Sequence, residues 1–238
     1  MSKNLNLEKL KLILKLMKKE AIKRDAPVYR KRKLFGSNPF KNLILAILSS
    51  RTRDENLYKI GKRLFEKVKS PKDILEIDKK ELERILFGIG FYKVKARILK
   101  EVSRQILEDF NGKVPDNLDD LLKLKGVGKK VAKVVLAQAF GKPYIAVDVH
   151  VHRISNRLGL VSTKSPEETD KILEKIIPNK LKLEFNRTLV GFGQTVCKPL
   201  KPLCDNCPIK SLCPRIGVNY KHPKNQSRYL PKVQNHTA

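Results

Sequence analysis

The chain has 238 residues, enough for one large domain or two small ones. Lysine and arginine number 52 against 24 acidic residues, so the formal net charge is +28. A polyanion is therefore the expected partner, nucleic acid before an anionic membrane surface. No segment is apolar enough to span a bilayer, and lysines interrupt the apolar positions of residues 5–17. We expect no membrane association and no secretion, but a cytoplasmic, nucleoid-associated prokaryotic protein.

Apolar residues recur with helical spacing along most of the chain. Asp54 is expected to cap one helix, and Ser165 another, in a capping box with Glu168. A single alternating run, residues 146–152, is too little for a sheet, so the fold is predicted to be all-α. The polar, basic tail over 215–238 is expected to be flexible. The expected helices cover residues 7–17, 40–50, 54–68, a short segment after Ser70, 79–87, 92–110, 117–124, 129–140, 149–158, a segment after Ser165, and 178–196.

Two glycines separated by one apolar residue, Gly126-Val127-Gly128, stand between a short helix and a basic helix that opens with Lys129. Without Cβ atoms, such a turn can bring backbone N–H groups against a phosphate at a helix N-terminus. Val127 would anchor the turn in the core. The pattern favours a helix-hairpin-helix that grips the backbone of DNA, although a plain helix–helix turn is the alternative.

Lys130 and Asp148 are the candidate catalytic pair. Lys130 lies in the first turn of the helix after the hairpin, where the helix dipole, Lys129 and partial burial would favour the neutral, nucleophilic amine. The alternative is one more phosphate-facing cation. Asp148 is the only acid between Phe140 and Gly159 and is expected to cap the following helix. It could also take a proton from the amine or stabilise positive charge on a sugar.

All four cysteines of the chain, Cys197, Cys204, Cys207 and Cys213, follow the pattern C-x6-C-x2-C-x5-C. Four thiolates in one short loop predict a metal centre, either an iron–sulfur cluster or a structural zinc ion. Lys198 and Lys201 in the first gap could present a basic ridge to DNA.

Two turns are candidates for insertion into DNA. Arg51 could act as a wedge, and Phe91 could enter the base stack. A solvated loop and a core aromatic are the respective alternatives. His150 and His152 form an H-x-H pair, but neither has an obvious partner ligand, so we interpret both as structural residues.

Residues 124–140, 146–150 and 153–157, together with the cysteine spacing, resemble endonuclease III, the cluster-containing branch of the helix-hairpin-helix DNA glycosylases. The resemblance runs from about Phe40 to Cys213. It implies two helical domains flanking a DNA-binding cleft. One is a six-helix domain with the hairpin over 32–142, and the other is a discontinuous [4Fe–4S] cluster domain over 1–31 and 143–214.

On this resemblance, Lys130 matches the lysine that forms a Schiff base and Asp148 matches the catalytic aspartate. It implies a monomeric DNA glycosylase and abasic-site (AP) lyase of base excision repair, which removes oxidised pyrimidines from double-stranded DNA and nicks abasic sites by β-elimination. A monofunctional glycosylase for T or U opposite G and a non-enzymatic DNA-binding module with zinc are the alternatives. The chain departs from the family at Lys125, where proline is common, and at Arg51, where glutamine is common.

Overall fold

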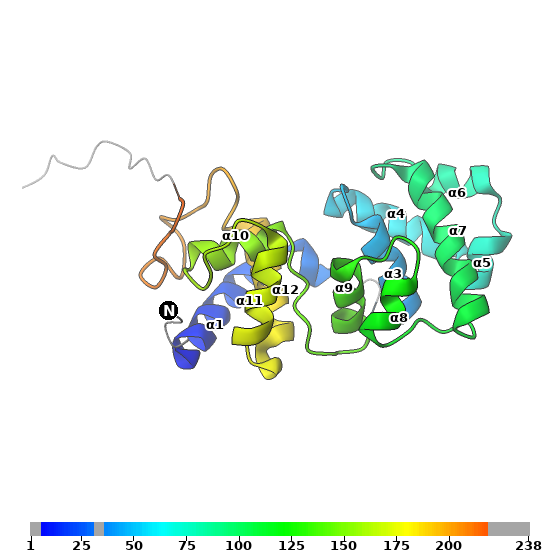
Figure 1. Ribbon diagram of the computed structural model, residues 1–238. Coiled ribbons are helices and arrows are strands. Elements are labelled where there is room, and N and C mark those ends of the chain that lie inside the picture. Colours follow the sequence, from blue (N-terminus) through cyan, green and yellow to red (C-terminus); the bar gives the residue numbers. More distant parts are fainter. Residues whose placement is uncertain (1–5, 31–35, 219–238) are drawn as a thin grey trace, which may run out of the picture.

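The computed structural model describes residues 6–30 and 36–218, and these residues form helices and no strand. Residues 219–238, most of the tail expected to be flexible, lie outside the described part. The predicted all-α fold is confirmed (Figure 1). The helices are α1 (Leu7–Lys23), α3 (Pro39–Leu48), α4 (Asp54–Lys67), α5 (Pro71–Glu76), α6 (Lys79–Leu86), α7 (Tyr92–Asp109), α8 (Leu118–Lys123), α9 (Lys129–Ala139), α10 (Val149–Arg157), α11 (Pro166–Ile176) and α12 (Asn179–Thr195).

The helix starts follow the capping signals, with two corrections. Asp148 caps α10 as expected. The N-cap of α4 is Arg53, and Asp54 is the first helical residue, so its predicted role as a cap is wrong. Ser165 caps α11, but the Glu168 carboxylate accepts from the backbone N–H of Lys164 and not of Ser165. Only one half of the predicted capping box therefore forms.

Two hydrophobic cores organise the described residues. The first is built from buried side chains of α3 to α9, among which every residue of α3 from Asn42 to Leu48 is buried. The second combines α1 with residues 145–209, and Phe185 and Phe192 of α12 are its largest fully buried side chains. Figure 1 shows the two corresponding lobes, with α1, α10, α11 and α12 in one and α3 to α9 in the other. The predicted domain boundaries, at 31/32 and 142/143, stay a prediction.

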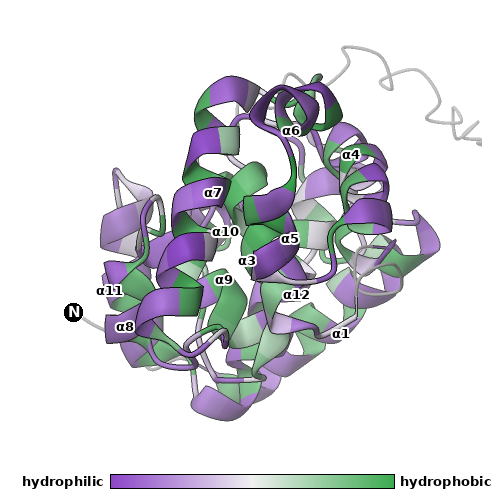
Figure 2. Cartoon of the chain, turned by 90° about the vertical axis from the view of Figure 1, so that its right-hand side faces the viewer, coloured by the Kyte–Doolittle hydropathy of each residue, from purple (hydrophilic) through white to green (hydrophobic). Residues whose placement is uncertain are grey.

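Hydropathy follows this arrangement within the lobe of α3 to α9. Hydrophobic residues gather on α3 and α9, at the centre of Figure 2, whereas α6, α7 and α8 turn hydrophilic faces outward. Asn42 is the polar exception in α3, and its buried amide donates to the carbonyls of Gly36 and Asn38. Burial of the apolar faces supplies most of the stabilisation that holds such short helices together.

Polar contacts join the two lobes. The Gln194 side chain of α12 donates to the Asp54 carboxylate at 2.6 Å and accepts from the backbone N–H of Val28 at 3.1 Å. The Tyr58 hydroxyl donates to the carbonyl of Pro27 at 3.0 Å. Side chains of α4 and α12 thus help to hold the lobes together.

Among the described residues, no helix is both long enough and apolar enough to cross a membrane.

Candidate functional site

The glycine hairpin joins α8 to α9, and its two glycines have different structural roles. Gly126 has a φ of +75°, and a Cβ there would lie 2.7 Å from Cγ2 of Ile98. Gly128 is the N-cap of α9 with a φ of −87°, and a Cβ there would meet nothing within 4 Å. Val127 between them is buried, as predicted. Gly126 is therefore needed for the turn itself, whereas Gly128 leaves open space in front of the helix N-terminus.

The first turn of α9 has the features of an anion site. No side chain caps it, it contains no acidic residue, and Lys129 and Lys130 follow the N-cap directly. Unpaired N–H groups, the helix dipole and two cations all favour a negative charge here.

Gln105 of α7 holds the hairpin in place, and sequence reasoning missed it. Its side-chain oxygen accepts from the backbone N–H of Lys125 at 2.7 Å, and its amide donates to the carbonyl of Lys123 at 3.3 Å. A glutamine 18 to 20 residues before its partners leaves no local signal in the sequence.

Lys130 and Lys129 are both exposed on α9. The expected partial burial of Lys130 is therefore wrong for the free protein, because the first turn of α9 presents its side chain at the surface. Exposure leaves the amine accessible to a large substrate.

Asp148 is half-buried and fixed by its own helix. Its Oδ1 accepts from the backbone N–H groups of His150 and Val151, both at 2.9 Å. From Lys130 to the end of α9 the chain travels about 14 Å, and the connecting residues 140–148 reach about 30 Å when extended. The segment crosses from one lobe to the other in Figure 1. The chain is thus long enough to return Asp148 to the Lys130 end of α9.

The two histidines of the H-x-H pair belong to separate networks. His150 Nδ1 lies 3.1 Å from a guanidinium nitrogen of Arg153, and burial lowers the pKa of His150 below its ordinary value. His152 Nδ1 lies 2.7 Å from the hydroxyl of Thr169. These contacts fit the interpretation of both histidines as structural residues.

The structure brings the two predicted wedge residues, Arg51 and Phe91, into contact. The Arg51 guanidinium lies 5.3 Å from the centre of the Phe91 ring, a cation–π distance. Both residues are exposed, with Phe91 at 59%, and both have a positive φ, +50° and +58°. Phe91 is therefore no core aromatic, and a cation and a ring stand side by side at the surface.

Lys95 supports the Arg51 turn and was also missed. Its ammonium donates to the carbonyls of Leu48 and Ser50 and to the Thr52 hydroxyl, at 2.8, 2.5 and 3.2 Å. Burial lowers the pKa of Lys95 to about 8. The partners of Lys95 lie more than 40 residues away in the chain, so the local sequence around it does not predict this role.

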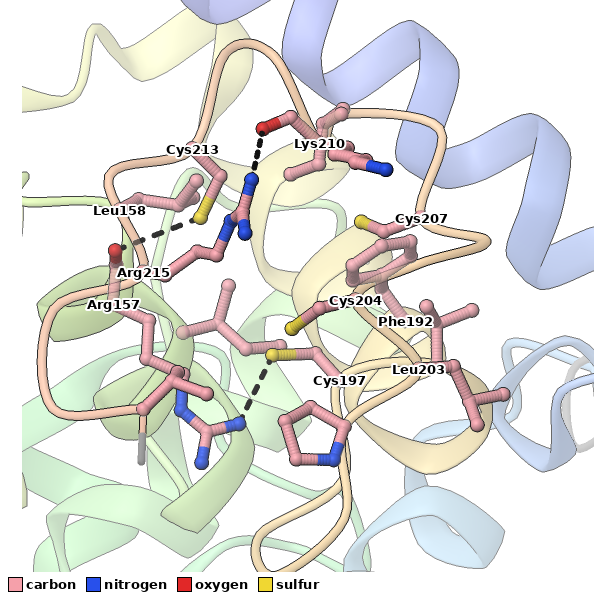
Figure 3. A pocket seen from close by; sticks show the side chains of 15 residues that line it. Arg157, Leu158, Phe192, Cys197, Leu203, Cys204, Cys207, Lys210, Cys213 and Arg215 are labelled. Atoms are coloured by element: carbon pink, nitrogen blue, oxygen red, sulfur yellow. Dashed lines mark hydrogen bonds between the residues drawn. The ribbon is translucent and has the colours of Figure 1, made fainter. Parts of the chain in front are cut away.

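The four cysteines line one pocket. Figure 3 shows the sulfur atoms of Cys197, Cys204, Cys207 and Cys213 turned toward it. All four cysteines are half-buried, and none of them forms a disulfide. Burial raises the pKa of Cys207 to about 11 and that of Cys204 and Cys213 above the ordinary value.

The pocket has the donor set and the surroundings that a thiolate-bound metal centre requires. Apolar side chains, among them Phe192 and Ile209, line it. Arg157 is buried and donates to Sγ of Cys197 at 3.3 Å, which would stabilise a thiolate. The residues therefore fit a thiolate-bound group by the chemistry of their donors. Their spacing does not show such a group, since in the described part of the chain no three His, Cys, Asp or Glu side chains are close enough together to hold a metal ion. The identity of the group stays a prediction.

Lys198 and Lys201, the predicted basic ridge, are exposed on the loop between the first two cysteines. Arg157 fixes the base of this loop by donating to the carbonyls of Lys198 and Pro199, both at 2.8 Å. Leu200 at the tip is 93% exposed. The cysteine pocket and the ridge thus share one arginine.

Known proteins are similar to this chain over most of its length. A family model described as HhH-GPD superfamily base excision DNA repair protein matches residues 44–179. Endonuclease III of Thermotoga maritima is 46% identical over 177 residues, which are 74% of this chain and 83% of that protein. The chain belongs to the endonuclease III family. Endonuclease III of Bacillus subtilis is 41% identical over 181 residues, 76% of this chain and 83% of its own length.

Solved structures of similar fold support membership of this family. A trapped covalent endonuclease III–DNA intermediate has a TM-score of 0.77 at 38% identity and covers 88% of this chain and 96% of its own. A thermostable thymine-DNA glycosylase has a TM-score of 0.75 at 31% identity, with coverage of 87% and 95%. As an endonuclease III homologue, the chain is a DNA glycosylase of base excision repair, and AP lyase activity is typical of this family.

Proposed function

We propose that this endonuclease III homologue excises damaged, oxidised pyrimidines from double-stranded DNA and nicks the resulting abasic site, with Lys130 as the nucleophile and Asp148 as its partner. The observation that carries the proposal is an accessible lysine in the first turn after the hairpin, followed by a half-buried, oriented carboxylate on the next helix. A single amine can perform both steps because it stays covalently bound to the sugar between them.

The catalytic steps follow from these two groups. An extruded nucleotide presents its C1′ to Lys130. Because Lys130 is exposed in the free protein, it is the bound DNA that must cover the amine and exclude water from the site. Asp148 accepts a proton from the amine or stabilises the positive charge on the sugar as the C1′–base bond breaks. The resulting Schiff base acidifies C2′, and β-elimination then breaks the bond to the 3′ phosphate.

The remaining predicted residues hold the DNA. The backbone turn of Gly126, Val127 and Gly128, with Lys129, binds a phosphate near the lesion. Arg51 and Phe91 enter the space left by the extruded nucleotide as one unit, since the Arg51 guanidinium already lies over the Phe91 ring. The partner is one DNA duplex with a damaged base or an abasic site, and the protein acts as a monomer in the cytoplasm.

The cysteine pocket is proposed to bind a [4Fe–4S] cluster through Cys197, Cys204, Cys207 and Cys213. When bound, the cluster supplies four metal–thiolate bonds that tie the loop together. In this scheme the chain contributes the fixed loop itself: Arg157 holds the carbonyls beside the first cysteine, and Lys198 and Lys201 face the phosphates from there.

Borohydride trapping tests the proposal. The protein is incubated with a duplex that contains one abasic site, and borohydride reduces any Schiff base to a stable adduct. Wild type and Lys129→Gln are expected to form the adduct, whereas Lys130→Gln is expected to form none. Asp148→Asn is expected to trap more slowly. An adduct with Lys130→Gln would overturn the assignment of the nucleophile.

One observation favours the monofunctional alternative: the 31% identity and TM-score of 0.75 with a thymine-DNA glycosylase. This alternative predicts release of thymine from a T·G duplex with no adduct and an intact strand. The same trapping assay on T·G and oxidised-pyrimidine duplexes separates the two activities.

A further inference from the structure

Four charged side chains form a network between the two lobes. The Lys133 ammonium of α9 lies 2.7 and 2.8 Å from the two carboxylate oxygens of Asp170, and 2.9 Å from Oε1 of Glu174, both on α11. Lys182 of α12 donates to Oε2 of Glu174 at 2.5 Å. The lysine side chains are only 8% exposed and the acids 22% and 23%. Two positive and two negative charges balance within this network.

The network crosses from one hydrophobic core to the other. Ala132, just before Lys133 on α9, and Val135, two residues after it, are buried in the core of α3 to α9. Leu173, next to Glu174 on α11, is buried in the core that contains α1 and α12. The ion pairs therefore fix α9 against α11 and α12.

Glu174 contacts the chain at two points that lie between Lys130 and Asp148 in the sequence. Lys133 follows Lys130 by three residues, so the two share one side of α9. Oε1 of Glu174 also accepts from the backbone N–H of Ile145 at 3.3 Å, three residues before Asp148. Asn186 of α12 holds the adjoining Ala146 through both its N–H and its carbonyl, at 3.2 Å each. One carboxylate thus contacts the helix of Lys130 and the segment that leads to Asp148.

Stability alone does not explain this placement. Burying an ion pair costs the hydration free energy of both charges. Such a pair therefore often stabilises the fold no more than apolar side chains of similar volume would. The surface ion pair Lys67–Glu81, by contrast, lies within one lobe, and its side chains are 59% and 35% exposed. A charged network at the point where both catalytic segments meet is instead suited to setting their geometry.

We propose that Glu174 is a positioning residue that sets the orientation of Lys130 relative to Asp148 by binding Lys133 and the N–H of Ile145 at once. This inference rests on the proposed function of Lys130. Glu174 itself touches no reacting atom. Its loss should leave DNA binding intact and slow the attack on the sugar, because small misplacements of a reacting group cost much of the rate.

The test separates rate from affinity. Wild type and Glu174→Gln, each in saturating excess over an abasic duplex, are trapped with borohydride at a series of times. Affinity is measured on a duplex with a tetrahydrofuran abasic analogue, which has no aldehyde to react. The rate constant of Glu174→Gln should fall about tenfold or more, while its affinity stays within about threefold. Glu81→Gln, at the surface pair with Lys67, is the matched control and should match wild type in both.

A double variant covers the case in which the single variant does not fold. Lys133→Met combined with Glu174→Gln removes one charge of each sign, so the net charge of the network stays zero. The ion pair that links α9 through residue 174 to the segment before Asp148 is nevertheless lost. Its rate constant should also be low. A wild-type rate in either variant would overturn the inference and leave the lyase assignment standing. A wild-type protein that forms no adduct would overturn the lyase assignment and this inference with it.

Discussion

The substitution Gly128→Asp should stabilise the free protein and weaken its hold on DNA. Gly128 is an N-cap with extended backbone and no side-chain cap, and a Cβ there would meet nothing within 4 Å, so Asp fits without strain. An aspartate cap contributes a few tenths of a kcal/mol over glycine, and its charge at the helix N-terminus adds a similar amount or more. The sum is about 1 kcal/mol, which raises Tm by about 3 °C in a chain of this size.

DNA binding should change in the opposite direction. A carboxylate about 5 Å from a phosphate costs about 3 kcal/mol at an effective dielectric constant of 20, before salt screening. Since 1.4 kcal/mol corresponds to about tenfold in affinity, we expect a loss of about tenfold or more on a tetrahydrofuran duplex at fixed salt.

Asn6→Asp is the matched control for Gly128→Asp. It adds the same charge at another helix N-terminus, that of α1, far along the chain from the hairpin. Its affinity for the duplex should equal that of wild type. Undiminished affinity in Gly128→Asp, with Tm raised, would refute phosphate binding at the hairpin.

Three further outcomes are expected. Gly126→Ala should lower the free energy of unfolding by about 2 kcal/mol in a urea titration, because its φ of +75° is strained for alanine and Ile98 must move; an unchanged midpoint would contradict this. Because the pKa of Lys95 is lowered to about 8 from 10.5, the unfolded state binds more protons between these values, so raising the pH from 8 to 10.5 should stabilise wild type relative to Lys95→Met; a constant difference between the two proteins would count against it. Anaerobically purified wild type should be brown with about four irons per chain, and Cys207→Ser should lose iron and Tm; colourless wild type with one zinc would favour the zinc site.

Local patterns predicted the helices well because periodicity and caps act over a few residues. The glycine turn, the N-cap at Asp148 and the short helix after Ser70 all depend on neighbours in the chain. The exposure of Lys130 could not be predicted, because the shape of the surface around it depends on how distant helices pack.

The residues that support the site were not predicted from the sequence, because their partners lie far away in the chain. Gln105, Lys95 and Glu174 act on partners about 20 to 47 residues away, and none stands in a motif. The sequence predicts insertion into DNA for Arg51 and for Phe91 separately. Their contact joins two turns 40 residues apart, so it follows only from the fold. The roles of Lys130 and Asp148 came from resemblance to a family and not from spacing alone.

The central claim is that the Lys130 amine makes the covalent bond to the sugar. Proteolysis of the borohydride-trapped wild-type complex, followed by tandem mass spectrometry, locates the lysine that carries the sugar remnant. The account predicts the modification on Nζ of Lys130 and an unmodified Lys129. A remnant on Lys129, or on any other amine, would contradict it.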